Sequence, residues 1–549
     1  MSEETRLRRH ILDVSIGDIS HRFTDVLVLG SGAAGLRAAI EAAPGAKVVV
    51  VAKQTCEETN TLYAQGGIAA VLDVGDSMEE HARDTIKAGQ GLCRKDVVET
   101  IVSEGPDCIK ELAAWGARFD RSGESLAFAR EGGHSRARIV HARGDATGGE
   151  IMATLVRKAR SLENIRWLEV AYAIDLFTDD ARHAQPGGAC RGALIHSDGA
   201  LMALWAKKVI LATGGCGRIY RETTNPPIAT GDGLAMAYRA GADLANMEFV
   251  QFHPTTLYVA GASRALISEA VRGEGARLVT GAGREFMKDY DPLGDLAPRD
   301  IVSRAILQEM SITGDTSAYL DLSRINHKHF ATRFPNITRL CESFDIDIGK
   351  DLVPVRPSAH YLVGGVRTDL EGHTSVRNLL AAGEVANTGF HGANRLGSNS
   401  LLEAIVMGRR AGRRAAQEAA RRKKDAEPVP LSPAKDRTWG AAASIDLKDM
   451  LDSLRSLMWR SGGIIRNGAD LNRALSKIRF WQTYVLPRRF DSPRGWELQN
   501  MLMLAEIIVH SALLRKESRG VHYRSDFPET DNKNWRRPTI TRGLPRPGC

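Results

Sequence analysis

The 549-residue chain lacks the features that mark membrane proteins and disulfide-bonded secreted proteins. Its seven cysteines are an odd number with no Cys-X-X-Cys pair, which argues against a disulfide framework or a structural zinc site. No window holds the ~18 uninterrupted apolar residues of a membrane helix, and the basic N-terminus lacks a signal-peptide core. We therefore expect a cytoplasmic protein that requires neither a membrane nor a metal.

The chain also lacks the signs of nucleic-acid binding. Its formal net charge is +8, yet no aromatic residues are interleaved with the basic ones and no zinc-finger or RNP signature is present. The densest basic cluster, Arg421–Lys424, is followed by acidic residues and prolines, as at a helix end that runs into a linker. Glycine, by contrast, is in excess, with 53 residues, about 10% against a usual ~7%. Glycines outside a repeat serve turns and close approach to a ligand.

Four regions of different pattern follow one another along the chain. Residues 24–245 alternate short apolar runs with helical patterns, which favours a parallel sheet flanked by helices. Weaker patterning and many turn residues at about 250–355 indicate an inserted domain, and Asn378–Arg422 resumes the first style. The Arg- and Pro-rich tail from Asn532 to Cys549 is expected to be poorly ordered. Between the Pro-rich linker and this tail, a helical stripe is predicted by the 3-and-4 spacing of Leu447, Met450, Leu451, Leu454, Leu457 and Met458.

A glycine-rich segment follows the first predicted strand, Val26–Leu29. It reads Gly30-Ser31-Gly32-Ala33-Ala34-Gly35 and runs into the helical segment Leu36–Ala43. A GxGxxG motif between a strand and a helix predicts a dinucleotide site. The first glycine makes the turn, the second admits a pyrophosphate, and the third lets the helix pack with its N-terminus toward the phosphates.

The next predicted strand departs from the fingerprint of NAD-binding proteins. It ends at Lys53, where that fingerprint has an acid for the ribose, and this lowers the case for NAD. Two further strands are followed by small residues, at Ala212–Gly215 and Ala382–Glu384. Ligands lie beyond the carboxyl ends of such strands, so we expect the three strand ends to converge.

Longer motifs occur in one order along the chain and resemble a known family. They are Asn60–Gly67, Ala212–Gly215, Gln251–Thr255, Ser268–Gly275, Pro298–Asp300, His360–Tyr361, Ala382–Glu384 and His391–Leu396. From Asp25 to about Pro528 the chain resembles the fumarate reductase/succinate dehydrogenase flavoproteins, and within them the members that oxidise L-aspartate. The resemblance implies an α/β fold with four parts: a Rossmann-like FAD-binding domain (1–248 and 357–424), an inserted α+β capping domain (249–356), a linker (425–434) and a C-terminal helical domain with a flexible tail (435–549).

The resemblance also implies which residues hold FAD. They are Gly30, Ser31, Gly32, Ala33, Ala34, Gly35, Lys53, Asn60, Thr61, Leu62, Tyr63, Ala64, Gln65, Gly66, Gly67, Asp232, Glu384, Ser400 and Leu401. Covalent members of the family bond the flavin to a histidine in the segment that ends in Ala-Gln-Gly-Gly. Alignment on Gln65–Gly67 places Asn60 at that position, and asparagine does not form this bond. The resemblance therefore implies noncovalent FAD.

The segment Arg130–Ser135 resembles the motif in which a glutamate, here Glu131, faces the substrate. The dicarboxylate dehydrogenases lack an acid at this position. L-aspartate differs from succinate by an ammonium group, and a carboxylate pairs with that group. The alternative is that Glu131 is a solvated loop acid, the commonest environment of glutamate.

The resemblance implies that both carboxylates of the substrate are bound. The contacts are Arg395, whose planar fork suits a carboxylate, and His253, Ser268, His360 and Ser398.

The resemblance places Arg299 beside the carbon that loses a proton. Free arginine is a poor base, so a relay is needed, and Glu269 and Arg272, at i and i+3 on one helical turn, match the relay positions. The alternative is an ion-pair network that only supports the loop.

The implied activity is FAD-dependent oxidation of L-aspartate to iminoaspartate, with oxygen or fumarate as electron acceptor. In the family this reaction feeds quinolinate synthesis for NAD, which makes quinolinate synthase a candidate partner. The alternative enzyme is a soluble fumarate reductase or succinate-oxidising flavoprotein. A catalytically silent FAD-binding electron carrier is the alternative from another class, and a complete set of substrate residues would be unexpected in it.

Overall fold

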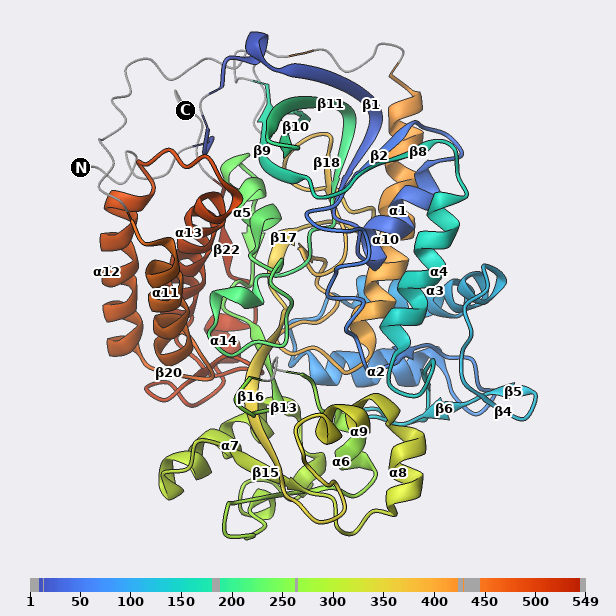
Figure 1. The fold of residues 1–549 in the computed structure, drawn as a ribbon, viewed down its shortest axis with the longest axis vertical. Helices are drawn as coiled ribbons and strands as arrows, with labels where there is room; N and C mark the ends of the chain where they lie inside the picture. Colours follow the sequence, from blue (N-terminus) through green and yellow to red (C-terminus); the bar gives the residue numbers. More distant parts are fainter. Residues whose placement is uncertain are drawn as a thin grey trace.

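The computed structural model describes residues 9–12, 14–179, 188–261, 265–422, 428 and 445–543. The expected linker at 425–434 lies outside the described residues except for Pro428. A central sheet covered by helices, a smaller lobe below it and a bundle of long helices beside it make up the molecule (Figure 1). The expected fold class is confirmed.

Seven strands form the central sheet. In spatial order they are β8 (Ile165–Leu168), β2 (Val48–Val51), β1 (Ser20–Leu29), β11 (Ala200–Leu211), β10 (Cys190–Ser197) and β9 (Tyr172–Thr178), with β18 (Leu379–Ala381) also paired to β11. Pairing is parallel from β8 to β11 and between β11 and β18, as expected, but antiparallel between β11, β10 and β9. The turn Asp198–Gly199 accounts for the antiparallel part, because both residues have positive φ (51° and 74°) and such two-residue turns close a β-hairpin.

One face of this sheet is covered by helices that pack closely. They are α1 (Ala33–Ala42), α3 (Lys95–Ala114), α4 (Thr147–Arg160) and α10 (Asn399–Ala420), with α2 (Met78–Ala88) beyond them. A Cβ on Gly408 would lie 2.5 Å from the Ala34 carbonyl oxygen, and one on Gly412 would lie 2.2 Å from that of Ala38. Glycine thus lets α10 lie directly against α1, which brings the N-termini of both helices to the same edge of the sheet.

The lower lobe has its own sheet and apolar core. Its antiparallel strands are, in order, β13 (Val250–Leu257), β16 (Val353–Leu362), β15 (Ala318–Asp321) and β14 (Arg277–Val279). Its helices are α6 (Glu269–Gly273), α7 (Arg299–Thr313), α8 (His327–Arg333) and α9 (Pro335–Glu342). The expected boundary after residue 356 falls inside β16, which runs unbroken from the lobe into the main body.

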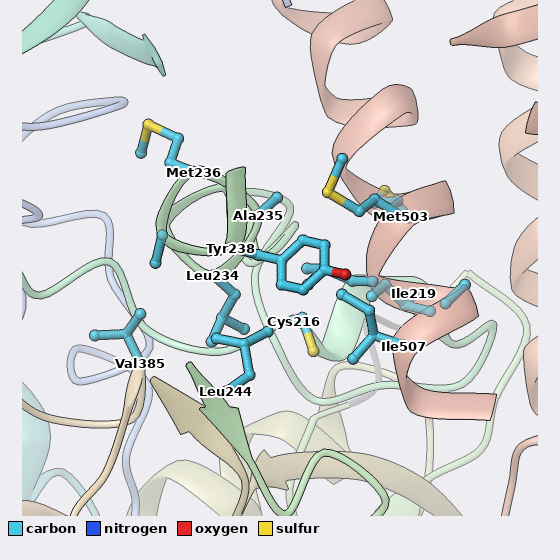
Figure 2. Close-up of a cluster of buried hydrophobic side chains, with 14 of the residues drawn as sticks. Cys216, Ile219, Leu234, Ala235, Met236, Tyr238, Leu244, Val385, Met503 and Ile507 are labelled. Atoms are coloured by element: carbon cyan, nitrogen blue, oxygen red, sulfur yellow. The ribbon is translucent and has the colours of Figure 1, made fainter. Parts of the chain in front are cut away.

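Three helices form the bundle: α11 (Leu447–Ser461), α12 (Gly468–Val485) and α13 (Pro493–Leu514). The predicted stripe on α11 is confirmed, since its members are buried apart from the half-buried Leu447. By length and composition α13 could cross a membrane, but 72% of its most apolar window is buried inside the structure. Figure 2 shows Met503 and Ile507 of α13 beside Tyr238 of α5 (Asp232–Arg239) in the shared core.

The expectation of a poorly ordered tail from residue 532 is wrong for residues 532–543, and residues 544–549 lie outside the described part. The tail forms α14 (Asn532–Trp535) and β22 (Ile540–Thr541), and β22 pairs with β12 (Leu244–Ala245). The fully buried Arg515 donates to the carbonyl oxygens of Trp535 and Arg537 at 2.9 and 2.8 Å. Local composition suggested a solvated tail because this anchoring guanidinium lies outside it.

Arg515 also pairs with Glu248 and Glu517 at 2.6 and 2.8 Å, and all three side chains are fully buried. Arg515→Met is expected to lower the free energy of unfolding by about 3–5 kcal/mol, because buried carboxylates lose their shared cation. Urea denaturation followed by tryptophan fluorescence measures the change. The control Lys350→Met removes one partner of an exposed pair and should leave the midpoint nearly unchanged. Equal midpoints for the two variants would contradict the anchoring role of Arg515.

Candidate functional site

A cavity of about 740 Å³ lies at the carboxyl-terminal edge of the central sheet and extends to the lower lobe. Leu29 pairs with Leu211, and Leu211 pairs with Ala381, so β1, β11 and β18 end side by side. The expected convergence of three strand ends is therefore confirmed. The small residues that follow these strands line the cavity: Gly30, Ala212, Thr213, Gly214, Ala382 and Gly383.

The three glycines of the GxGxxG loop meet different surroundings. A Cβ on Gly30, whose φ is +108°, would lie 2.2 Å from the Ala212 carbonyl oxygen, and one on Gly35 would lie 2.0 Å from that of Gly30. These two glycines are required by packing of the protein itself. A Cβ on Gly32 would meet nothing closer than Thr61 Oγ1 at 3.6 Å. The space beside Gly32 is thus open to a ligand at the N-terminus of α1.

Lys53, at the end of β2, pairs with acids that come from elsewhere in the chain. Its Nζ lies 2.8 Å from Asp232 Oδ2, 2.7 Å from Glu497 Oε1 and 2.7 Å from Thr230 Oγ1. Burial lowers the pKa of Lys53, but the charges of Asp232 and Glu497 raise this pKa by a larger amount, so the net shift is upward. The acids beside this strand end therefore come from α5 and α13, and they pair with Lys53.

Asp232 lines the cavity, but the protein already occupies both of its oxygens. Oδ2 accepts hydrogen bonds from Lys53 Nζ at 2.8 Å and from Thr230 Oγ1 at 2.7 Å. Oδ1 accepts from Tyr172 Oη and Asn500 Nδ2, both at 2.7 Å. Asp232 is thereby suited to fix Lys53 and Tyr172 against the cavity rather than to accept further hydrogen bonds.

Several buried polar atoms in this half of the cavity have no protein partner. They are Asn60 Oδ1, Gln65 Oε1 and Thr213 Oγ1. Asn60 Nδ2 donates to Glu384 at 3.2 Å, and burial raises the pKa of Glu384 to about 7, although backbone and Asn60 hydrogen bonds oppose the rise. Unsatisfied buried polar groups call for a polar ligand, and a cavity with an open glycine loop and these groups fits FAD.

The residues expected to hold FAD are brought together, with two exceptions. Gly35 packs beneath Gly30, and Leu62 packs on the core under α1. The others all line the cavity: Gly30, Ser31, Gly32, Ala33, Ala34, Lys53, Asn60, Thr61, Tyr63, Ala64, Gln65, Gly66, Gly67, Asp232, Glu384, Ser400 and Leu401.

At the lobe end of the cavity, Arg299, Glu269 and Arg272 form one network. Arg299 begins α7, and its Nε donates to Glu269 Oε2 at 2.7 Å. Arg272 Nη2 lies 3.6 Å from Glu269 Oε1, and its Nη1 donates to the Asp295 carbonyl oxygen. Arg299 and Glu269 line the cavity, whereas Arg272 lies behind Glu269. The predicted trio is therefore contiguous, with one cation at the surface of the site and one beneath it.

Two neutral histidines lie next to each other beside this network. Burial, reinforced by the charges of Arg299 and Arg395, holds the pKa of both His253 and His360 well below its usual value. The Thr255 N–H donates to His253 Nδ1, so the proton of the neutral ring is on Nε2, and this buried nitrogen has no protein partner. His253 therefore offers an unused hydrogen-bond donor to an anion.

Arg395 completes the cationic wall. Its guanidinium lies 4.5 Å from the ring centroid of Tyr361, and Nη1 donates to Ser400 Oγ at 3.1 Å. Burial and the charge of Arg299 lower the pKa of Arg395 to about 10, so it remains charged at neutral pH. Its buried Nε has no protein partner. Ser268, which caps α6, also lines the cavity.

Glu131 is 5% exposed, so the alternative of a solvated loop acid is excluded. Ser398 Oγ donates to its Oε2 at 2.8 Å, and His141 Nε2 lies 3.7 Å from its Oε1. Burial alone would raise the pKa of Glu131, but His141, the charge of Arg299 and the Ser398 hydroxyl hold it at about 2. An ionised carboxylate thus faces the same cavity as two guanidinium groups.

Sequence reasoning missed several residues of this site. Gln251 accepts from Arg299 Nη1 at 3.4 Å and donates to the Arg395 carbonyl oxygen at 2.8 Å. Its position two residues before His253 on β13 was an available signal, because alternate residues share a strand face. Glu497 and His141 carried no such signal, since each comes from a segment without a motif.

Comparisons with known proteins agree with this geometry. A family model described as "FAD binding domain" matches residues 25–401, and one described as "Fumarate reductase flavoprotein C-term" matches residues 451–546. L-aspartate oxidase of Streptomyces coelicolor is 42% identical over 94% of this chain and 91% of its own length. L-aspartate oxidase 1 of Ralstonia nicotianae is 46% identical over 92% and 96%.

Among solved structures, a mutated E. coli quinol fumarate reductase superposes with a TM-score of 0.86, at 34% identity over 95% of this chain and 94% of that one. The sequence relatives are full-length, and the structural match includes both the sheet and the helical bundle. The chain therefore belongs to the fumarate reductase/succinate dehydrogenase flavoprotein family and, within it, to the L-aspartate oxidases.

Proposed function

We propose that this chain oxidises L-aspartate to iminoaspartate with noncovalently bound FAD, and that oxygen or fumarate accepts the electrons. The observation that carries the proposal is Glu131, a buried ionised carboxylate in a cavity whose other walls are suited to anions. The reaction is the first step of de novo NAD biosynthesis through quinolinate. We expect quinolinate synthase to consume the product, and a cytoplasmic location fits the six described cysteines, which are all unpaired.

Glu131 and Arg299 both line the cavity, and both lie close to Gly397. A Cβ on Gly397 would lie 2.8 Å from Glu131 Oε2 and 3.3 Å from Arg299 Nη2. A substrate above Gly397 would then have its ammonium on the carboxylate side and its neighbouring carbon on the guanidinium side. Succinate lacks the ammonium and would therefore be bound without the pairing to Glu131 that L-aspartate makes, which disfavours succinate.

The substrate carboxylates would be bound by Arg395, His253, His360 and Ser268. Arg395 presents a planar fork with an unused Nε, which suits bidentate binding. The histidines donate hydrogen bonds while remaining neutral, so they bind an anion without adding charge to a site that already holds Arg299 and Arg395.

Arg299 would take a proton from the substrate carbon next to the one that carries the ammonium, while the amine-bearing carbon gives up the hydride. The nitrogen also loses a proton, and the enamine so formed tautomerises to iminoaspartate. A guanidinium normally keeps its proton, so its neutral form needs support from a neighbour. Glu269 bonds Arg299 Nε and contacts Arg272, which gives the proton a path away from the cavity. FAD, when bound by the glycine loop and by Asn60–Gly67, supplies the hydride acceptor.

Asn60 supports a noncovalent cofactor. Its side chain donates to Glu384 and leaves Oδ1 free toward the cavity. An amide forms a hydrogen bond to a flavin but does not form the bond that a linking histidine makes.

The direct test is anaerobic mixing of the FAD-loaded chain with L-aspartate or with succinate, followed by visible absorbance. L-aspartate is expected to bleach the flavin at least about tenfold faster than succinate, since one charge-assisted hydrogen bond is involved. Faster bleaching by succinate would instead favour a succinate-oxidising flavoprotein. Slow bleaching with both would indicate an electron carrier.

Arg299→Lys is expected to keep bound FAD and lose nearly all turnover with L-aspartate. Lysine retains the positive charge but lacks the planar guanidinium. Only the guanidinium can donate to Glu269 and face the substrate at the same time. FAD content by absorbance and oxygen consumption are the two measurements. The control Arg304→Lys changes an arginine of the same helix outside the cavity and should retain turnover. If Arg299→Lys turns over as the parent does, another base must be sought.

Glu131→Gln is expected to weaken L-aspartate oxidation while sparing fumarate reduction by the reduced enzyme. The lost interaction is a charge-assisted hydrogen bond, about 1.5–3 kcal/mol, or roughly tenfold to a hundredfold in kcat/KM. Fumarate has no ammonium, so its binding should be unchanged or tighter. An equal loss in both reactions would show that Glu131 only orders its loop.

A further inference from the structure

His141 contacts Glu131, yet neither the family motifs nor the proposed chemistry gives it a role. It follows β7 (Ile139–Val140), is 5% exposed, and places Nε2 3.7 Å from Glu131 Oε1. A buried imidazole next to a substrate-facing carboxylate affects both the direction and the charge of that carboxylate.

We propose that His141 is a positioning residue for substrate choice: it keeps Glu131 ionised and turned toward the ammonium of an amino dicarboxylate. The inference rests on the proposed function and adds to it a residue through which Glu131 acts.

The geometry shows what would follow if His141 were absent. Ser398 holds Oε2 of Glu131, and His141 is the group that faces Oε1. Oε1 also lies near Gly66, since a Cβ on that glycine would be 3.6 Å away, so the carboxylate points at the cofactor side of the cavity. Without His141, Oε1 could swing toward Arg299, which shares the approach to Gly397. An internal ion pair would then occupy the groups that the substrate needs.

The charge argument requires a proton on Nε2 of His141, the atom that faces Glu131, in either the neutral or the protonated ring. A neutral imidazole with its proton on Nε2 donates toward Glu131 and an imidazolium pairs with it, so both states favour the carboxylate over the carboxylic acid. Three other groups favour the ionised form of Glu131. They are the cations Arg299 and Arg395 and the hydrogen-bond donor Ser398.

Two further titratable groups lie close to Glu131, one on its own loop and one on α6. His134 lies behind it, bonded to the Gly397 carbonyl oxygen at 3.0 Å. Glu269 lies over Gly132, whose Cβ would be 2.2 Å from Glu269 Oε1, and its negative charge opposes ionisation of Glu131. His141 therefore counters both burial and a nearby carboxylate.

The sign of the pH effect follows from these contacts. With its pKa at about 2, Glu131 is ionised throughout the neutral range in the parent. Loss of His141 leaves burial less opposed and raises the pKa of Glu131. Recognition of the ammonium is then lost as the pH falls through the raised pKa and is recovered as the pH rises.

The experiment measures kcat/KM for L-aspartate oxidation and for fumarate reduction across pH with the FAD-loaded parent, His141→Phe and His141→Gln. For His141→Phe at about pH 6, kcat/KM for L-aspartate should fall about tenfold or more and recover toward the parent near pH 8.5, whereas fumarate reduction should not change. The acid-side pKa of the L-aspartate profile should be lowest in the parent, intermediate in His141→Gln, which keeps a neutral donor, and highest in His141→Phe.

His134→Phe is the matched control for a disturbed loop. It removes the bonds to Gly397 and Arg138 and should weaken both reactions equally at every pH. If His141→Phe behaves in the same way, or if neither His141 variant shifts the L-aspartate profile, the inference is overturned. If His141→Phe does not fold, the comparison of His141→Gln with the parent decides. L-aspartate oxidation by the parent shows separately that the proposed function stands.

Discussion

Arg299 and Arg395 place two positive charges in one buried cavity. The pKa of Arg395 is lowered to about 10, by burial first and by Arg299 next. Both guanidinium groups are held in place by the protein. That of Arg395 lies 4.5 Å from the ring centroid of Tyr361, and Arg299 Nε donates to Glu269 at 2.7 Å. The neighbouring polar groups respond to these cations: the two histidines stay neutral, and Glu131 stays ionised.

The cations are held by parts of the chain that lie far apart in sequence. Two backbone hydrogen bonds hold the loop before Arg395 in place. The Ala393 N–H donates to the Gly89 carbonyl oxygen, and the Val521 N–H donates to the Ala393 carbonyl oxygen. Gly520 is required there, because a Cβ would lie 2.3 Å from the Ala393 carbonyl oxygen. The C-terminal segment therefore supports the substrate side of the cavity as well as closing the bundle. Glu517 connects this support to the anchored tail, because it pairs with Arg515 and with Arg519, and Arg519 donates to the carbonyl oxygen of Gln90 next to Gly89.

The sequence predicted those parts of the site that depend on residues close together in the chain. One such part is the unit of strand, glycine loop and helix, and another is the convergence of the strand ends at Leu29, Leu211 and Ala381. Both depend on the periodicity of apolar residues and on turn residues, and the structure has them as expected. The antiparallel β9–β10–β11 extension was missed although Asp198–Gly199 is a hairpin signal. Such a short turn is easily overlooked between strands that are buried on both faces and carry no alternation.

What the sequence left open depends on long-range contacts. Lys53 departed from the NAD fingerprint, but its acids come from residues 232 and 497, far from it in the sequence. The tail was predicted as disordered because its partner Arg515 lies outside it. His141 was not considered because its only distinguishing property is the distance to Glu131. Each case is a long-range contact of a charged or titratable side chain, and neither period nor composition encodes such a contact.

The same balance of charges bears on which substrate the site prefers. At the lobe end, the guanidinium groups of Arg299 and Arg395, with Arg272 behind them, lie with the carboxylates of Glu269 and Glu131. With Glu384 protonated, since its pKa is raised to about 7, this set carries one positive charge. L-aspartate, with two carboxylates and one ammonium, carries one negative charge and neutralises that site. An unsubstituted dicarboxylate carries two and would leave an excess negative charge in a buried place, which is costly. Were Glu131 neutral, the site would carry two positive charges and would match the unsubstituted dicarboxylate instead. On this balance, the proposed role of Glu131 in substrate choice depends on its negative charge rather than on the shape of the cavity.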